Sequence, residues 1–144
     1  MTLFKTLIKD HDTQRDLLER LMQTRGDSEE RETLFKKAKL ELVSHAAAEE
    51  RALYVPMMEI DETQEQARHS VAEHNQIDEL IERLEGIDFD AAEWLTTAEK
   101  LQKAVTHHLD EEEETVFQMA DKVIEDDRQA ELARLYREEM DDAR

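Results

Sequence analysis

Apolar residues recur every three or four positions along most of this chain, which is the spacing of one face of an amphipathic helix. The pattern predicts five helical segments separated by short polar stretches. Gly26 ends the first segment and Gly86 the third, while Pro56 should kink or end the second. The fourth segment begins just after Asp88 or Asp90. The predicted helices cover residues 2–24, 28–59, 62–85, 90–124 and 128–140.

The four long segments predict an all-α fold: an antiparallel up-down-up-down four-helix bundle with a short C-terminal fifth helix. Only 2 glycines and 1 proline occur in the 144 residues, which leaves little material for the turns of a β-sheet. A chain of this length is large enough to bury one core, so residues 1–144 are expected to form a single domain.

The excess of acidic residues argues against two classes of binding partner. The chain has 38 acidic and 19 basic residues, which gives a formal charge of −19. Nucleic acids and anionic membranes are bound mainly through Lys and Arg, so neither is expected here. No stretch is apolar over the roughly 18 residues of a membrane span, and the default location is the cytoplasm. Cysteine is absent, so a metal would be held by nitrogen and oxygen ligands.

A motif of histidine and glutamate occurs twice, 63 residues apart (11 to 74 and 45 to 108). In each copy an acidic residue precedes the first histidine, and the second histidine begins the sequence His-x-x-x-Glu-Glu. Residues four apart share one face of a helix. Two such copies supply the residue types that a two-metal site inside a helical bundle requires. The candidate metal ligands are His11, His45, Glu49, His74, His108 and Glu112.

These candidate ligands are predicted to face the core, because apolar residues lie one and two helical turns away from them. Leu42 and Val105, for example, stand three residues before His45 and His108. A lone histidine beside an apolar stripe is typical of a hydrogen-bonded core residue. A buried carboxylate, in contrast, is costly unless a cation or strong donors meet it. A metal pair is the simplest partner for two buried glutamates and four histidines.

Other ionisable residues near the motif are predicted to lie at the surface, because each residue turns about 100° around its helix. Tyr54 falls about 180° from His45 and is not expected to serve the metal. His69 points about 140° away from His74, among polar neighbours. The residues assigned to solvent in this way are Glu50, His69, His107, Glu111, Glu113 and Glu114.

The repeated motif resembles the hemerythrin-like family, also called the HHE cation-binding domain, over about residues 7–120. The resemblance implies a centre of two iron ions in a four-helix bundle, with terminal histidine ligands and two bridging carboxylates. Carried onto this chain, it makes terminal ligands of the four motif histidines and bridges of Glu49 and Glu112. Imidazole and carboxylate ligands suit iron, and bridging carboxylates hold two metals about 3.5–4 Å apart.

One position departs from the family pattern. Oxygen-carrying hemerythrins have a further histidine on the third helix, one turn before the first, where this chain has Ser70. Water, His69 after a local helix distortion, or Glu73 would fill the gap. A more open site suits a sensor, an iron-handling protein or a peroxide-reactive enzyme at least as well as a reversible oxygen carrier.

Three functions are therefore considered. The first is a non-haem di-iron protein that binds O2 or a related diatomic such as nitric oxide, for sensing, transport or iron handling. The second is a di-iron enzyme that acts on peroxide or another oxidant. The third is a metal-free or zinc-bound helical scaffold, with a homodimer contact on the face around Tyr54, Phe117 and the fifth helix. Packing of that helix on the bundle is the simpler interpretation of its apolar face.

Overall fold

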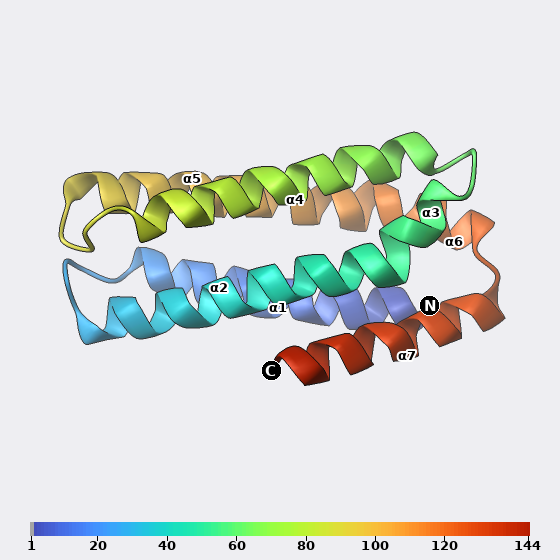
Figure 1. Cartoon of the computed structure of the whole chain (residues 1–144), viewed down its shortest axis with the longest axis horizontal. Coiled ribbons are helices and arrows are strands. Elements are labelled where there is room, and N and C mark those ends of the chain that lie inside the picture. Colours follow the sequence, from blue (N-terminus) through green and yellow to red (C-terminus); the bar gives the residue numbers. More distant parts are fainter. Residues whose placement is uncertain (1) are drawn as a thin grey trace.

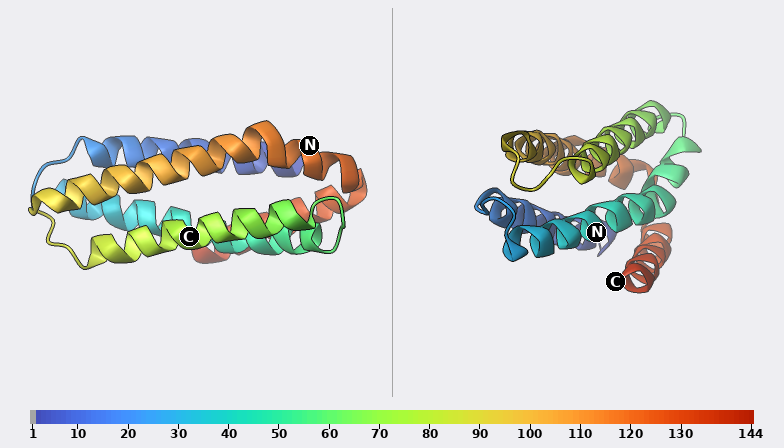
Figure 2. Two further views of the ribbon diagram at one scale, coloured as in Figure 1. Left: turned by 90° about the horizontal axis from the view of Figure 1, so that it is seen from above. Right: turned by 60° about the vertical axis from the view of Figure 1, so that its left-hand side comes forward.

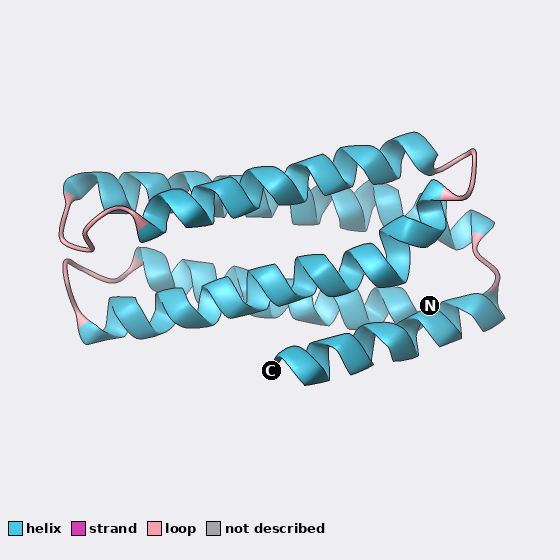
Figure 3. Cartoon of the chain, viewed as in Figure 1, coloured by secondary structure: helices cyan, strands magenta, loops and turns pink. Residues whose placement is uncertain are grey.

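The computed structural model describes residues 2–144, and every regular element among them is a helix (Figure 1, Figure 3). The all-helical prediction is thus confirmed, with no strand in this part of the chain. The α-helices are α1 (Thr2–Met22), α2 (Glu29–Glu49), α3 (Val55–Met58), α4 (Gln64–Glu85), α5 (Ala92–Glu111), α6 (Phe117–Val123) and α7 (Asp126–Ala143). Two π-helical turns complete the elements, η1 (Glu50–Tyr54) and η2 (Glu112–Val116).

The long helices pack side by side into a bundle. Helix α1 pairs with α2 and α4 pairs with α5, and α1 also packs against α5 (Figure 2). Helix α7 crosses back over the surface of α1 and α2, which confirms that the apolar face of the predicted fifth helix packs on the bundle. Among residues 2–144, no helix is long and apolar enough to cross a membrane.

The two π-helical turns interrupt segments that were predicted to be continuous. In each turn a backbone N–H bonds to the carbonyl five residues back, from Val55 to Glu50 and from Phe117 to Glu112. A turn with one extra residue rotates everything after it by about 100° relative to an ideal α-helix. Tyr54 and Phe117 are consequently buried, so the predicted exposed dimer face around them is wrong. The prediction for Pro56 is confirmed, because its helix ends two residues later at Met58.

A buried arginine fastens the loops at one end of the bundle. The Ser28 hydroxyl caps α2 by accepting the backbone N–H of Arg31 at 3.1 Å. The Arg31 guanidinium donates to both oxygens of Thr24 in the first loop and to the carbonyl of Phe89 in the second. It also lies 4.6 Å from the ring centroid of Trp94, within the range of a cation–π contact. One side chain therefore holds the α1–α2 and α4–α5 loops together.

Two apolar clusters form the core, and a polar layer separates them along the helices. On α1, Leu3, Phe4 and Leu7 belong to one cluster, and Leu18 and Leu21 to the other. The buried residues between them on the same helix are polar: Asp10, His11 and Gln14. Because the layer has apolar side chains on both sides, charges inside it are shielded from water. This layer contains the candidate site.

Candidate metal centre

The structure brings all of the predicted ligands into the buried polar layer. His11 and Glu49 are 0% exposed, Glu112 is 1% exposed, and the other three histidines are 3% exposed. Helix α1 carries His11, α2 carries the His45–Glu49 pair, α4 carries His74 and α5 carries His108. Glu112 opens the turn η2. The prediction that these side chains face inward is confirmed.

The carboxylates of Glu49 and Glu112 lie at the middle of the cluster. On one side, Nε2 of His11 is 3.1 Å from Glu112 Oε1, and Nε2 of His45 is 3.4 Å from Glu49 Oε2. On the other side, Nε2 of His74 is 3.1 Å from Glu49 Oε1, and Nε2 of His108 is 3.3 Å from Glu112 Oε2. The six residues thus form two groups of potential metal ligands that share both glutamates.

The polar atoms at the centre of this cluster have no partners of their own. Nε2 of all four histidines, both oxygens of Glu49 and Oε1 of Glu112 are buried without a hydrogen bond. Leaving one buried polar atom unpaired costs about 1–3 kcal/mol, and more when it is charged. So many orphaned nitrogen and oxygen atoms facing one another fit a site for cations. The donor set, imidazole and carboxylate, suits first-row transition metals.

The other ring nitrogen of two histidines is held by a glutamate from the opposite repeat. Nδ1 of His11 lies 2.8 Å from Glu113, and Nδ1 of His74 lies 2.8 Å from Glu50. The two contacts are equivalent under the 63-residue repeat. A carboxylate that accepts from Nδ1–H leaves the Nε2 lone pair free for a metal. The assignment of Glu50 and Glu113 to the solvent was therefore wrong, because each carboxylate contacts a histidine ring on a helix of the other repeat, which angles counted along its own helix do not exclude.

The remaining two histidines are oriented by a second pair of acidic residues. Nδ1 of His108 lies 2.8 Å from Glu73. Nδ1 of His45 lies 2.6 Å from the Tyr136 hydroxyl, which donates in turn to Asp10 at 2.6 Å. Asp10 and Glu73 are equivalent in the repeat, but in the first repeat α7 inserts a tyrosine between the acid and the histidine. All four imidazoles thus have a fixed orientation.

Tyr54 also belongs to the site, contrary to the prediction. Its ring is fully buried, and its hydroxyl donates a hydrogen bond to Glu112 Oε2. Burial and the negative charges of Glu112 and Glu49 raise the pKa of this phenol well above its usual value. The Tyr54 hydroxyl also contacts Ser70, the position at which the family pattern has a histidine. The prediction from ideal helical geometry was wrong for Tyr54 because η1 turns this side chain into the core.

Neither of the two side chains predicted as substitutes for the missing histidine, His69 and Glu73, joins the six central ligands. The His69 side chain is 55% exposed and lies at the surface beside Glu73 and Glu111, as its sequence neighbours predicted. The Glu73 carboxylate holds the outer nitrogen of His108. Both side chains thus point away from the position of the missing ligand at Ser70. The phenol of Tyr54 lies beside Ser70 instead.

The carboxylates of the cluster raise the pKa values of three of its histidines. Burial by itself would lower the pKa of His11, but the nearby carboxylates of Glu112, Glu113 and Glu49 outweigh it and raise the pKa to about 11. The pKa of His74 is raised in the same way to about 9, and that of His108 to about 10. The pKa of Glu49 is lowered by the surrounding imidazoles despite complete burial. The charges of the buried cluster thus favour additional positive charge, which a metal cation would also supply.

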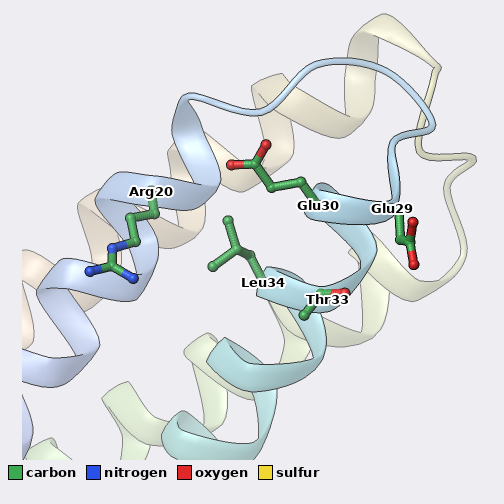
Figure 4. Close-up of a pocket in the computed structure, with 5 residues that line it drawn as sticks. All are labelled: Arg20, Glu29, Glu30, Thr33 and Leu34. Carbon is green, nitrogen blue, oxygen red and sulfur yellow. The ribbon is translucent and has the colours of Figure 1, made fainter.

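One surface hollow lies far from this chemistry. It has a volume of about 430 Å³ and sits at the end of the bundle, between the last turns of α1 and the start of α2 (Figure 4). Among residues 2–144, no group of potential metal ligands falls there, whereas two such groups lie in the buried layer. The lining residues are Arg20, Glu29, Glu30, Thr33 and Leu34. Function is accordingly sought at the buried cluster.

The helical bundle and its internal cluster define a class of protein: a helical domain with a buried cluster of nitrogen and oxygen groups that could hold cations. The model of the hemerythrin HHE cation-binding domain family matches residues 2–120. The chain therefore belongs to the hemerythrin HHE cation-binding family. No curated protein and no solved structure matches it.

Proposed function

We propose that this chain is a non-haem di-iron protein that binds O2 or a related diatomic ligand such as nitric oxide, in sensing, transport or iron handling. The observation that carries the proposal is the sharing of Glu49 and Glu112 by both groups of potential ligands. Such sharing suits two ions bridged by carboxylates, about 3.5–4 Å apart. His11 and His45 would complete the ligands of one ion, and His74 and His108 those of the other. The frame that we infer is a single up-down-up-down bundle built from the two repeats.

A pair of ferrous ions would supply the open coordination position and the electrons that O2, nitric oxide or peroxide chemistry needs. The protein contributes the rest. Its acidic and phenolic side chains hold each imidazole with Nε2 directed inward, which strengthens metal binding by about 10–100-fold per partner in comparable sites. The two apolar clusters exclude water from the layer, which strengthens every electrostatic interaction in it.

We infer that a diatomic ligand would bind at a small cavity beside three of the histidines. Its volume is about 10 Å³, close to the space that a single water molecule needs. Apolar side chains provide much of the wall, and Gln14 provides a polar group whose Nε2 is buried without a hydrogen bond. We infer that the Gln14 amide donates to the bound ligand. The lining residues are Gln14, Leu42, His45, Ala46, His74, Ile77, Val105, His108 and Leu109.

The cavity also lies between the two repeats. Its lining contains equivalent positions from both, including Leu42 with Val105 and Gln14 with Ile77. The last pair is where the symmetry breaks, since one member is a hydrogen-bond donor and the other is apolar. A ligand in the cavity would therefore meet a donor from one side only, which favours one orientation of a polar diatomic.

Replacing Gln14 with leucine should release the ligand faster without changing the metal content. Loss of one hydrogen bond is worth about 0.5–1.5 kcal/mol, so nitric oxide should dissociate up to about 10-fold faster. The measurement is stopped-flow absorption of iron-loaded, reduced protein that has bound nitric oxide. Ile77→Val, at the equivalent position of the other repeat, is the control and should change the rate little. Equal rates of nitric oxide dissociation from Gln14→Leu and from the unaltered protein would show that Gln14 does not hold the ligand. If no diatomic ligand changed the absorption of the protein, the proposed function would be wrong.

Peroxide turnover is the second candidate, and one observation favours it. A chain of hydrogen bonds leads from His45 through the Tyr136 hydroxyl to Asp10, whose side chain is 12% exposed. Such a chain is a route for protons between the centre and the surface. Steady-state consumption of peroxide well above that of free iron would select the enzyme over the diatomic-binding protein. A metal-free or zinc-bound scaffold would instead keep its stability after chelation of iron.

A further inference from the structure

A second group of metal-ligand side chains lies on the outside of the bundle, where α4 and α5 run side by side (Figure 2). His69 and Glu73 are four residues apart on α4, and His107 and Glu111 are four apart on α5, so each pair shares a face of its helix. The histidine side chains are 55% and 71% exposed, while Glu73 is 12% exposed and Glu111 is 25% exposed. The cluster is open to solvent but anchored by two partly buried carboxylates.

One nitrogen or oxygen atom each of His69, Glu73 and Glu111 lies within 4.8 Å of the other two, close enough to hold one ion, and His107 contacts the same two carboxylates. Nε2 of His69 is 3.4 Å from Glu73 and 3.2 Å from Glu111. Nε2 of His107 is 3.7 Å from Glu73 and 3.5 Å from Glu111. A tetrahedral metal with bonds of about 2.0–2.1 Å has ligand atoms about 3.4 Å apart. Each histidine thus approaches both carboxylates at the separation of neighbouring ligands.

We propose that His69, Glu73, His107 and Glu111 form a second cation site, at the surface, for a divalent transition metal such as Zn²⁺ or Fe²⁺. Imidazole nitrogen and carboxylate oxygen are the ligands that these ions take from proteins without cysteine. Within residues 2–144, neither glutamate of the group has an ion pair with lysine or arginine, and the contacts of both carboxylates with basic side chains are with histidines. A metal ion would supply the positive charge that the two carboxylates lack.

The other repeat shows a fixed cation in the corresponding place. Asp10 is the equivalent of Glu73, and the guanidinium of Arg144 from the end of α7 lies 3.0 Å from it. The positions that correspond to His69, His107 and Glu111 there are Thr6, Ser44 and Ala48, none of which is a metal ligand of this kind. The first repeat therefore neutralises its acidic residue with an arginine. The second repeat lacks that arginine and has four metal-ligand side chains instead.

Glu73 connects the surface site to the buried centre. Its Oε1 lies 2.8 Å from Nδ1 of His108, and its Oε2 faces His69 and His107. A cation on the outer oxygen would draw charge away from the oxygen that holds His108. The surface site is thus placed to receive an arriving divalent ion one carboxylate away from the internal cluster. Only this coupling rests on the proposed function; the surface site itself does not.

The test is a calorimetric titration of Zn²⁺ into the iron-loaded protein and into its variant His69→Ala/His107→Ala. Both histidines are exposed, so the double variant should keep the fold, which circular dichroism checks. We expect the unaltered protein to bind one more Zn²⁺ per chain than the double variant, or to bind it at least about 10-fold more tightly, a difference of about 1.4 kcal/mol or more. Glu114→Ala removes an exposed carboxylate three residues from Glu111 and should bind Zn²⁺ like the unaltered protein.

Two results would overturn the proposal. One is equal Zn²⁺ binding by the double variant and the unaltered protein. The other is complete loss of Zn²⁺ binding in Glu112→Ala, which would assign all of the binding to the buried cluster. If the buried cluster holds no iron but the double variant still loses one Zn²⁺, the surface site stands and the proposed function fails. The two proposals can therefore fail separately.

Discussion

Replacing Glu112 with alanine should empty both halves of the metal centre, whereas replacing a single histidine should weaken mainly one half. Glu112 belongs to both groups of potential ligands, and so does Glu49. His45 belongs to one group only. Losing a shared carboxylate removes a ligand from each ion and the negative charge between them. We expect the tightly bound iron to fall from about two per chain to near zero in Glu112→Ala, and to about one in His45→Ala.

Iron analysis after desalting measures this effect, with circular dichroism to confirm that each variant is helical. Glu114→Ala is the matched control, because it removes an exposed carboxylate two residues away on the same stretch of chain. Glu112→Gln keeps the shape of the side chain and separates loss of charge from loss of packing. Full iron occupancy in both Glu112 variants would show that this carboxylate is not a ligand.

Metal-free protein should lose stability as the pH rises above neutrality. The folded-state pKa values of His11, His108 and His74 are raised to about 11, 10 and 9, while an unfolded histidine titrates near 6.5. A raised pKa contributes stability that is complete below pH 6.5 and is lost as the pH rises through the folded pKa. The loss should therefore occupy the range from about pH 7 to pH 11 and amount to several kcal/mol, at about 1.4 kcal/mol per pKa unit.

The stability of the metal-loaded protein should change with pH in the opposite direction and rise as the pH rises. Metal ligands must be neutral imidazoles, so protons compete with the metal and acid releases it. Urea unfolding at pH 7 and pH 10, with iron and after chelation, tests both slopes together. His74→Ala should flatten the metal-free profile because it removes one of the raised pKa values. Metal-free protein that is equally stable at pH 7 and pH 10 would contradict the charge arrangement described for the cluster.

Much of the fold and the inner part of the site could be predicted from residue spacing. The period of apolar residues locates the helices because burial of one face dominates their stability. The 63-residue repeat identifies the inward histidines and glutamates, since His45 and Glu49 lie on a regular stretch of α2 where ideal geometry holds. The exposed position of His69 could be predicted in the same way, from its position around an ideal helix.

The outer part of the site was not predicted, for two physical reasons. Tyr54 ends a π-helical turn, and one extra residue per turn invalidates angles counted along an ideal helix. Glu50 and Glu113 contact histidines of the other repeat, and such contacts between helices are not given by angles counted along one helix. The recurrence of both glutamates in the repeat was a usable signal, but the ideal angle argued against it. Tyr136 lies outside the repeat, and its contact with His45 comes from the docking of α7, which no local pattern encodes.

The most direct test of the central claim is the number of tightly bound irons per chain. The protein would be expressed with iron, desalted, and passed over a chelating resin that strips exposed sites before analysis. Two groups of ligands that share Glu49 and Glu112 predict about two irons per chain. One iron or less in a folded chain would contradict the paired centre and, with it, the proposed di-iron function.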